Sequence, residues 1–277
     1  MIIDAHQHFW QLSRGDYGWL GPEAGALYRD YLPDDLAPLL KEHDVGATVL
    51  VQAAPTEAET HFLLRLAGEH AFVAGVVGWV DFEAADVAAR VAALATAGAG
   101  KLKGLRPMIQ DMADPHWIMR RELDAAFDAM VAHELVFDAL VRPVHLRALR
   151  ERLLRHPRLR AVLDHAGKPA IASGALEPWA AALERLARDT PICCKLSGLL
   201  SEAGTRCSAA DLTPWVAQVF SSFGAERMLW GSDWPVLNSA GSYAGWLGLA
   251  RELIERCASG CADQVLSGTA RRLYHLH

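Results

Sequence analysis

Two patterns of apolar positions alternate along the chain. Short apolar segments rich in valine, leucine and isoleucine are followed by longer segments whose apolar residues recur every three or four positions. The short segments predict strands buried on both faces, and the longer ones predict helices with one apolar face. The expected strands cover residues 1–5, 47–52, 72–80, 103–106, 136–141, 160–164, 192–196 and 227–231.

A helix is expected after each of these strands, and one more helix is expected at the end of the chain. Asp34, which follows Pro33, is predicted to cap the start of the first helix. Gly98 and Gly100 are predicted to form a left-handed cap after the third helix. The expected helices cover residues 34–44, 57–70, 84–97, 115–133, 145–155, 176–188, 212–223, 243–257 and 262–274.

Eight strand–helix units in 277 residues predict an α/β fold of the (β/α)8 TIM-barrel type. A doubly wound sheet is the main alternative, but no GxGxxG follows the first strand and no GxxxxGK[ST] occurs in the chain. No linker rich in proline, glycine or serine divides the sequence, so residues 1–277 are expected to form a single domain.

Composition narrows the function classes. The chain is 52% hydrophobic and carries 27 Lys+Arg against 33 Asp+Glu, a net charge of −6, which excludes a disordered chain. The mild acidity is spread along the sequence, so no nucleic acid partner is expected. No apolar run approaches the length of a membrane span, and no basic targeting segment precedes the first strand, so we expect a cytoplasmic protein without a membrane partner. The oligomeric state is left open.

The cysteines are odd in number and form no CxxC pair. We expect reduced thiols in a cytosolic protein, with a Cys257/Cys261 metal pair or a disulfide as alternatives. The five cysteines are Cys193, Cys194, Cys207, Cys257 and Cys261.

Polar residues that suit a metal ion follow three of the expected strands. In a barrel of this type, chemistry is located where the strands end. His6 and His8 follow the first strand and, because strand side chains alternate, are expected to point to one side. His165 follows the sixth strand and Asp233 the eighth. Three nitrogens and one carboxylate suit one divalent ion, with zinc expected, and leave a position open for water.

Each of these residues also has a simpler explanation. A His–x–His pair arises by chance in a chain with 12 histidines. His165 alone could be a hydrogen-bonded structural imidazole, and Asp233 alone could cap the following turn. Their coincidence at three strand ends favours the metal site.

Five motifs give the chain a family resemblance. They are HQHFW at 6–10, KGLR at 103–106, DHAGKP at 164–169, KLSGL at 195–199 and WGSDWPV at 230–236. The chain resembles the amidohydrolase superfamily, in particular its lactonase-rich branch, from the first expected strand to the eighth. The resemblance implies a hydrolase that opens a small-molecule lactone, such as L-fucono-1,5-lactone or a related aldonolactone.

The resemblance also implies residue roles. His6, His8 and His165 would be metal ligands, and Asp233 would be both a ligand and the general base. Dinuclear members of the superfamily use a carboxylated lysine on strand four and a histidine on strand five. Here residues 137–141 contain no histidine, and Lys103 begins its strand, so one ion is expected. Catalysis without a metal is kept as an alternative.

The expected reaction is attack of water on the ring ester carbonyl. Asp233 would take a proton from the water and return it to the leaving alkoxide. Without a metal, His165, Lys168 and Arg106 would stabilise the developing oxyanion. Arg106 is also expected to bind substrate, with a salt bridge at the barrel rim as an equal alternative.

Further substrate contacts are predicted at the ends of other strands. Gln52 follows the second strand and Trp79 lies at the end of the third. Trp234, with Trp10 and Trp19, flanks the expected mouth of the barrel, where aromatic rings stack on sugars or simply pack. Two other functions stay open: a metal-dependent non-oxidative decarboxylase and a non-catalytic barrel that binds a sugar acid.

Overall fold

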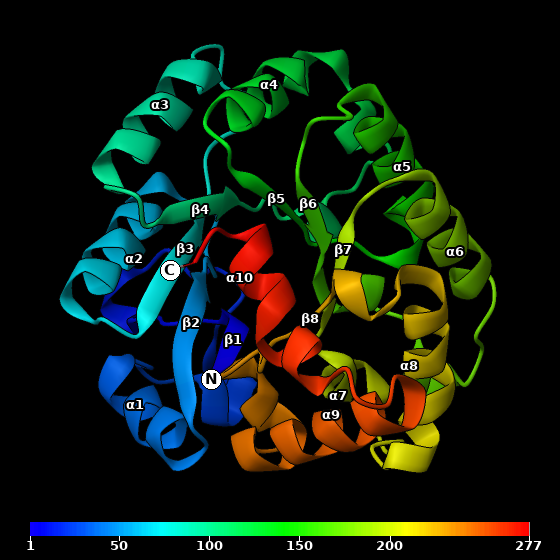
Figure 1. The fold of residues 1–277 in the computed structure, drawn as a ribbon. Helices are drawn as coiled ribbons and strands as arrows, with labels where there is room; N and C mark the ends of the chain where they lie inside the picture. The colour runs from blue at the N-terminus through cyan, green and yellow to red at the C-terminus, as the bar shows by residue number, and fades with distance from the viewer. Residues whose placement is uncertain (277) are drawn as a thin grey trace.

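The predicted barrel is confirmed by the computed structural model, which describes residues 1–276. Eight strands form one sheet in the order β1 to β8, and each strand is parallel to its neighbour (Figure 1). The strands are β1 (Ile2–Gln7), β2 (Val45–Val51), β3 (Val73–Gly78), β4 (Leu102–Leu105), β5 (Val136–Ala139), β6 (Ala161–Leu163), β7 (Cys193–Leu196) and β8 (Met228–Trp230).

Helices surround the barrel, and the last helix lies across one end of it (Figure 1). The short α7 between β7 and α8 was not predicted from the sequence. The helices are α1 (Pro33–Glu42), α2 (Glu57–Glu69), α3 (Val87–Ala97), α4 (Asp124–Ala132), α5 (Leu146–Arg155), α6 (Trp179–Asp189), α7 (Leu199–Ala203), α8 (Ala209–Phe223), α9 (Tyr243–Cys257) and α10 (Thr269–Leu273). No helix within residues 1–276 is both long and apolar enough to cross a membrane.

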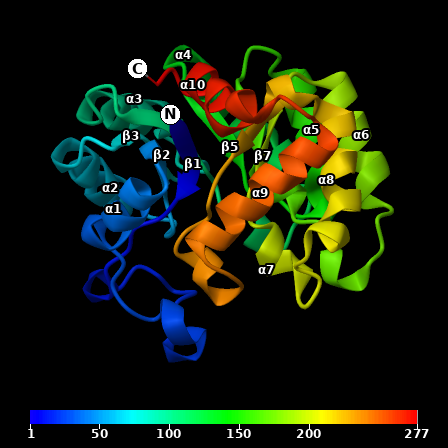
Figure 2. The ribbon, with the colours of Figure 1, turned by 60° about the horizontal axis from the view of Figure 1, so that its bottom comes forward.

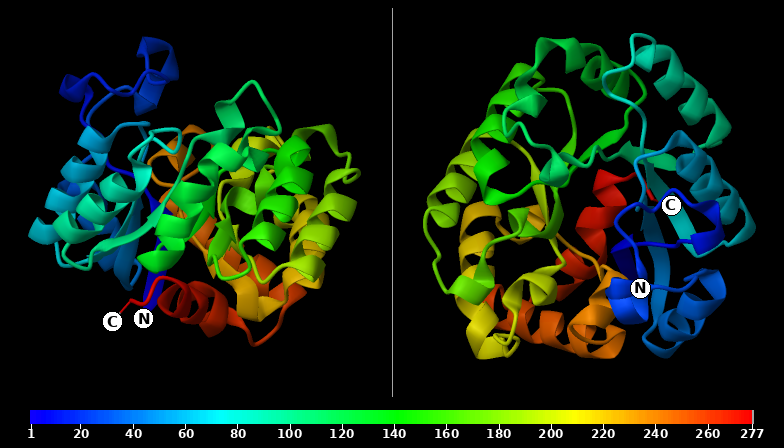
Figure 3. Two further views of the ribbon diagram at one scale, coloured as in Figure 1. Left: turned by 90° about the horizontal axis from the view of Figure 1, so that it is seen from above. Right: turned by 180° about the vertical axis from the view of Figure 1, so that it is seen from behind.

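The two ends of the barrel differ. Both chain termini and α10 lie at one end, whereas the long segment between β1 and α1 projects at the other (Figures 2 and 3). Tyr274 and Leu276 follow α10 and pack on an apolar cluster with strand residues such as Ile3 and Val49. The carboxyl ends of the strands, and with them the candidate site, therefore open toward the segment between β1 and α1.

The predicted helix over residues 115–133 is wrong in its first half. Residues 117–119 and 121–123 form separate 3-10 turns, and the regular helix begins at Asp124. The side chain of Arg152 explains the break, because its guanidinium donates to the carbonyl oxygens of Ile118 at 2.7 Å and Arg120 at 2.5 Å. A side chain from α5 thus binds both carbonyls, and that of Arg120 also accepts from the N–H of Leu123 at 3.4 Å within a 3-10 turn.

One predicted cap is wrong and another is confirmed only in part. Leu32, not Asp34, is the N-cap of α1, and its N–H donates to the Asp35 carboxylate at 2.9 Å. After α3, Gly100 is left-handed as predicted, with φ of +85°, but Gly98 is right-handed with φ of −71°. All five cysteines are free thiols, as expected.

The start of α2 contains a buried carboxyl group, Glu59, that makes the stability of the fold depend on pH. Glu59 accepts hydrogen bonds from the N–H groups of Ala53 and Ala54, yet burial raises its pKa from 4.5 to about 7. The folded protein therefore holds this proton more tightly than the unfolded chain, so stability falls as pH rises from 4.5 to about 7. We expect Glu59→Gln to remove about 3 kcal/mol of this pH dependence.

Urea unfolding of both proteins at pH 5 and pH 7.5 would measure this effect. Asp4 and Asp138 also have raised pKa values, so the difference between wild type and variant isolates Glu59. Parallel pH profiles for the two proteins would contradict the assignment.

Candidate functional site

The barrel closes between its first and last strands at the candidate site. The N–H of Asp233 donates to the carbonyl of His6 at 2.8 Å, and the N–H of His8 donates to the carbonyl of Trp234 at 2.7 Å. A Cβ atom at Gly231 would lie 2.6 Å from the Cβ of His6, so only glycine permits this approach. The backbone thus fixes His6, His8 and Asp233 side by side.

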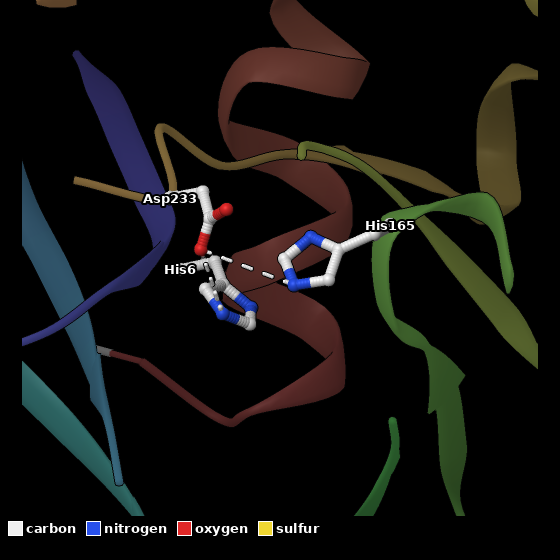
Figure 4. Close-up of side chains that lie close together, drawn as sticks. All are labelled: His6, His165 and Asp233. Atoms are coloured by element: carbon white, nitrogen blue, oxygen red, sulfur yellow. Dashed lines mark ion pairs between the residues drawn. The ribbon is translucent and has the colours of Figure 1, made fainter. Parts of the chain in front are cut away.

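Three imidazoles converge on one carboxylate oxygen. Oδ1 of Asp233 lies 3.6 Å from Nε2 of His6, 3.3 Å from Nε2 of His8 and 3.9 Å from Nε2 of His165. Figure 4 shows His6 and His165 approaching Asp233, His6 from β1 and His165 from the turn after β6. All four residues are buried. The structure therefore brings together the four residues that the sequence predicts as metal ligands.

The hydrogen bonds of His8 leave one of its ring nitrogens for the cluster. Nδ1 of His8 lies 2.8 Å from the carbonyl oxygen of Val51, and because a carbonyl only accepts, Nδ1 carries a hydrogen. Nε2 is therefore the ring nitrogen that faces the Asp233 carboxylate, at 3.3 Å. A proton or a metal ion between these two atoms would bind both of them.

The spacing of the donor atoms fits a divalent metal ion such as zinc. Ligands at about 2.0–2.2 Å from such an ion lie no more than about 4.4 Å apart. The ligand atoms of His6, His165 and Asp233 all lie within 4.8 Å of one another, and Nε2 of His8 lies 3.2 Å from Nε2 of His6. The four side chains could hold one such ion with small adjustments.

Burial sets the charges of this cluster. Burial lowers the pKa of His165 to about 4, and burial together with the Lys195 ammonium holds the pKa of His6 well below its ordinary value. Burial alone would raise the pKa of Asp233, but its contacts with His165 and His8 hold it below its ordinary value. Near neutral pH the site therefore offers two neutral imidazoles and an ionised carboxylate, the protonation states that metal binding requires.

An unusual backbone turn presents His165 and Lys168. Four consecutive residues from His165 to Lys168 have φ between +52° and +71°, a left-handed 3-10 turn. Side chains three residues apart eclipse in such a turn, so both point to the same side. Left-handed backbone costs non-glycine residues about 1 kcal/mol or more each, and it occurs preferentially at functional sites.

Glycine next to this turn makes room for the His165 ring. A Cβ atom at Gly198 would lie 2.5 Å from Nδ1 of His165. The same nitrogen shares a hydrogen bond of 2.8 Å with Oγ of Ser197. The orientation of His165 is therefore set by Ser197 and by the absence of a side chain at Gly198.

A cavity of about 280 Å³ opens beside the cluster and is large enough for one small molecule. Its lining combines polar and apolar side chains. The polar lining comprises His8, Arg106, Gln110, Asp111, His165, Lys168 and Asp233. The apolar lining comprises Trp19, Ala53, Met108, Leu140 and Val236.

Arg106 faces this cavity and is held rigidly by its neighbours. Its Nε and Nη2 donate to Oε1 of Gln52 at 3.2 and 2.9 Å, and its Nη1 donates to Asp164 at 3.2 Å. Nη1 also lies 3.4 Å from Nε2 of His6. Gln52 is buried behind Arg106 and does not line the cavity, so it positions the guanidinium instead of facing a ligand.

The tryptophans predicted as substrate contacts differ in whether they line the cavity. Trp19 lines the cavity, whereas Trp79 and Trp234 do not. Trp234 packs edge-to-face on Tyr31 at 5.2 Å and borders a second cavity, whose lining includes Tyr31 and Tyr243. Trp10 is buried in the packing of the segment between β1 and α1.

A buried charged network beneath the site was missed by the sequence analysis. Nζ of Lys195 lies 2.5 Å from Asp138, 2.9 Å from Asp164 and 3.1 Å from Nδ1 of His6. The hydroxyl of Tyr274 donates to Asp138 from below. The available signal was a charged residue inside an otherwise apolar strand, at Asp138 in β5 and Lys195 in β7. Lys103, by contrast, donates to the carbonyl of His275 at the far end of the barrel, as its position in the sequence predicts.

A parallel eight-stranded barrel with a His/His/His/Asp cluster where its strands end has the architecture of a TIM-barrel enzyme with a candidate metal site. The chain belongs to the amidohydrolase family, whose family model matches residues 3–276. The resemblance noted from the sequence motifs is thereby confirmed.

Curated relatives match over nearly the whole chain. The chain is 46% identical to an L-fucono-1,5-lactonase of Burkholderia ambifaria over 99% of its length and 95% of that protein. It is 41% identical to an L-fucono-1,5-lactonase of Burkholderia multivorans, over 99% of its length and 96% of that protein. A crystal structure of a Burkholderia multivorans amidohydrolase with bound zinc superposes with a TM-score of 0.90, at 39% identity and full coverage of both chains.

Proposed function

We propose that this protein hydrolyses a sugar lactone, with L-fucono-1,5-lactone as the first candidate substrate. The observation that carries the proposal is the 46% identity to an L-fucono-1,5-lactonase over 99% of the chain. The site supports it, because an ionised carboxylate and neutral imidazoles border a cavity for one small molecule. Residues 1–277 would act as one catalytic domain.

We propose that His6, His8, His165 and Asp233 hold one divalent ion, with zinc as the first candidate. The zinc in the Burkholderia multivorans structure supports this choice. When bound, such an ion polarises an ester carbonyl and lowers the pKa of water toward about 7. Nε2 of His8 and Oδ1 of Asp233, which lie 3.3 Å apart, are two of the atoms that would hold such an ion.

Asp233 is proposed to move the proton. Its carboxylate borders the cavity and is ionised, so it can accept a proton from the attacking water as the new C–O bond forms. When the ring C–O bond breaks, Asp233 returns this proton to the leaving alkoxide. The products are a free hydroxyl and a carboxylic acid, which releases a proton to solvent.

Arg106 and Lys168 are proposed to stabilise the negative charge that develops on the carbonyl oxygen. Both cations line the cavity with Asp233. Gln52 and Asp164 hold the Arg106 guanidinium in place, so little reorganisation is needed during the reaction. The left-handed turn holds Lys168 on the same side as His165.

A pH-indicator assay with sugar lactones and muconolactones tests the proposed function. We expect acid release from L-fucono-1,5-lactone or a related aldonolactone, loss of activity after chelation, and recovery with Zn²⁺ or Mn²⁺. Release of CO₂ from an aromatic acid, with no lactone turned over, would replace the lactonase by a decarboxylase. Tight sugar-acid binding without turnover would identify a binding barrel, and full activity in metal-stripped protein would remove the metal from the proposal.

The packing around His165 gives a further prediction. Gly198→Ala places a Cβ atom against the imidazole, so we expect displacement of the ring and a loss of about 10–100-fold in zinc affinity, with a matching loss of lactonase activity. Gly15→Ala is the matched control, because Gly15 has φ of 74° and ψ of 7° against 66° and 4° at Gly198 but meets no atom within 4 Å. Equal effects of the two substitutions would show that backbone strain, not the His165 contact, is responsible.

A further inference from the structure

Trp19 combines exposure with a position in the cavity wall. Among the large hydrophobic side chains that are exposed in residues 1–276, it alone lines the cavity beside the His/Asp cluster. Tyr28 lies on the same segment between β1 and α1 and has the same exposed fraction of 43%, but it lines none of the described cavities near the site. Exposure alone therefore does not explain where Trp19 is placed.

The Trp19 ring is fixed before any ligand arrives. Its Nε1–H donates to the carbonyl of Ala53 at 2.8 Å, and its ring packs edge-to-face on Trp10 at 5.4 Å. Trp10 is itself buried, and its backbone pairs with Tyr31 in both directions. The indole ring therefore lines the cavity with its only N–H group already hydrogen-bonded to the protein.

The segment that carries Trp19 is fastened to α2. Oγ1 of Thr56 donates to the Asp16 carboxylate at 2.8 Å, and Arg14 donates to the same carboxylate at 2.6 Å. The Arg14 guanidinium also lies 4.7 Å from the centre of the Phe62 ring. These contacts hold the segment as a fixed wall, so a ligand that stacks on Trp19 loses little freedom to loop ordering.

The cavity offers the exposed Trp19 ring together with several polar and charged side chains, a lining that suits a molecule with one apolar face and several polar groups. A pyranose ring has such a face, formed by C–H groups, with hydroxyls and the ring ester at its edge. We propose that Trp19 is a substrate-binding residue that stacks on the C–H face of the sugar lactone ring, with the ring ester on the side of Asp233 and Arg106. This inference rests on the proposed lactonase function and adds a specificity determinant to it.

Kinetics with freshly prepared L-fucono-1,5-lactone test the inference. Covering one face of an indole corresponds to about five- to tenfold in affinity, so Trp19→Ala should raise KM by that factor. Since stacking holds the ground state and the transition state alike, kcat should stay within about twofold. Trp19→Phe should retain most of the affinity, and Tyr28→Ala should match wild type.

Fluorescence provides a readout that does not need Trp19→Ala to fold. Titration of wild type with L-fuconate, the hydrolysis product, should change the tryptophan emission, and Trp19→Phe should lose that change. An unchanged KM in Trp19→Ala, or the same fluorescence change in Trp19→Phe, overturns the inference while lactone hydrolysis stands. If wild type hydrolyses no lactone, the proposed function fails, and the fluorescence titration still decides whether Trp19 contacts a sugar acid.

Discussion

Asp233→Asn is expected to lower kcat for lactone hydrolysis by about 10²-fold or more. The amide cannot accept the proton of the attacking water, and it is a weaker metal ligand than a carboxylate. Asp233 also has a left-handed backbone with φ of +60°, which asparagine tolerates as well as aspartate does. The substitution therefore changes the chemistry of the side chain with little change in the backbone. Initial rates of acid release, together with zinc content, measure both effects.

Asp44→Asn is a suitable control for this variant. Asp44 has a φ of +55°, is exposed just after α1, and lies outside the cavity. We expect this control to keep the wild-type rate. If Asp233→Asn kept more than about a tenth of that rate, proton transfer by Asp233 would be refuted.

The barrel and the four clustered residues were predictable from the sequence for a common physical reason. Parallel strands buried on both faces give continuous apolar runs, and the polar residues that interrupt them where the strands end meet at one end of a barrel. His6, His165 and Asp233 are far apart in the sequence, but they follow strands that the closed sheet brings together. The left-handed turn at His165 was not predictable, because glycine is the residue that indicates such a backbone and three of the four residues in this turn are not glycine.

The substrate contacts were less predictable because each depends on side-chain direction. Gln52 follows β2 as expected, but its amide turns to Arg106 rather than to the cavity. Trp234 is next to Asp233 in the sequence but packs on Tyr31 and does not line the cavity, whereas Trp19 lines it from the middle of an irregular segment. Strand periodicity describes regular backbone, so it does not determine where residues of loops and bends point.

Replacing the buried Lys195 beneath the site is expected to lower the free energy of unfolding strongly. Lys195→Met removes the ammonium that lies between Asp138 and Asp164, both of which are fully buried. Removing one partner of a buried ion pair costs about 3–5 kcal/mol, because the remaining charge stays desolvated. We expect a loss of this size in the free energy of unfolding, measured with urea, although methionine fills a volume similar to that of the lysine chain.

A second substitution should separate charge from packing. In Asp138→Asn/Lys195→Met the amide still accepts from Tyr274 while one buried negative charge is removed, so much of the lost stability should return. Lys103→Met is the control, because Lys103 is a half-buried lysine of β4 with a single carbonyl acceptor at the other end of the barrel. A loss for Lys195→Met no greater than for Lys103→Met would contradict this account. Nζ of Lys195 also lies 3.1 Å from Nδ1 of His6, so we expect Lys195→Met to bind zinc more weakly than wild type. The double variant still lacks this ammonium, so it should recover stability but not zinc affinity.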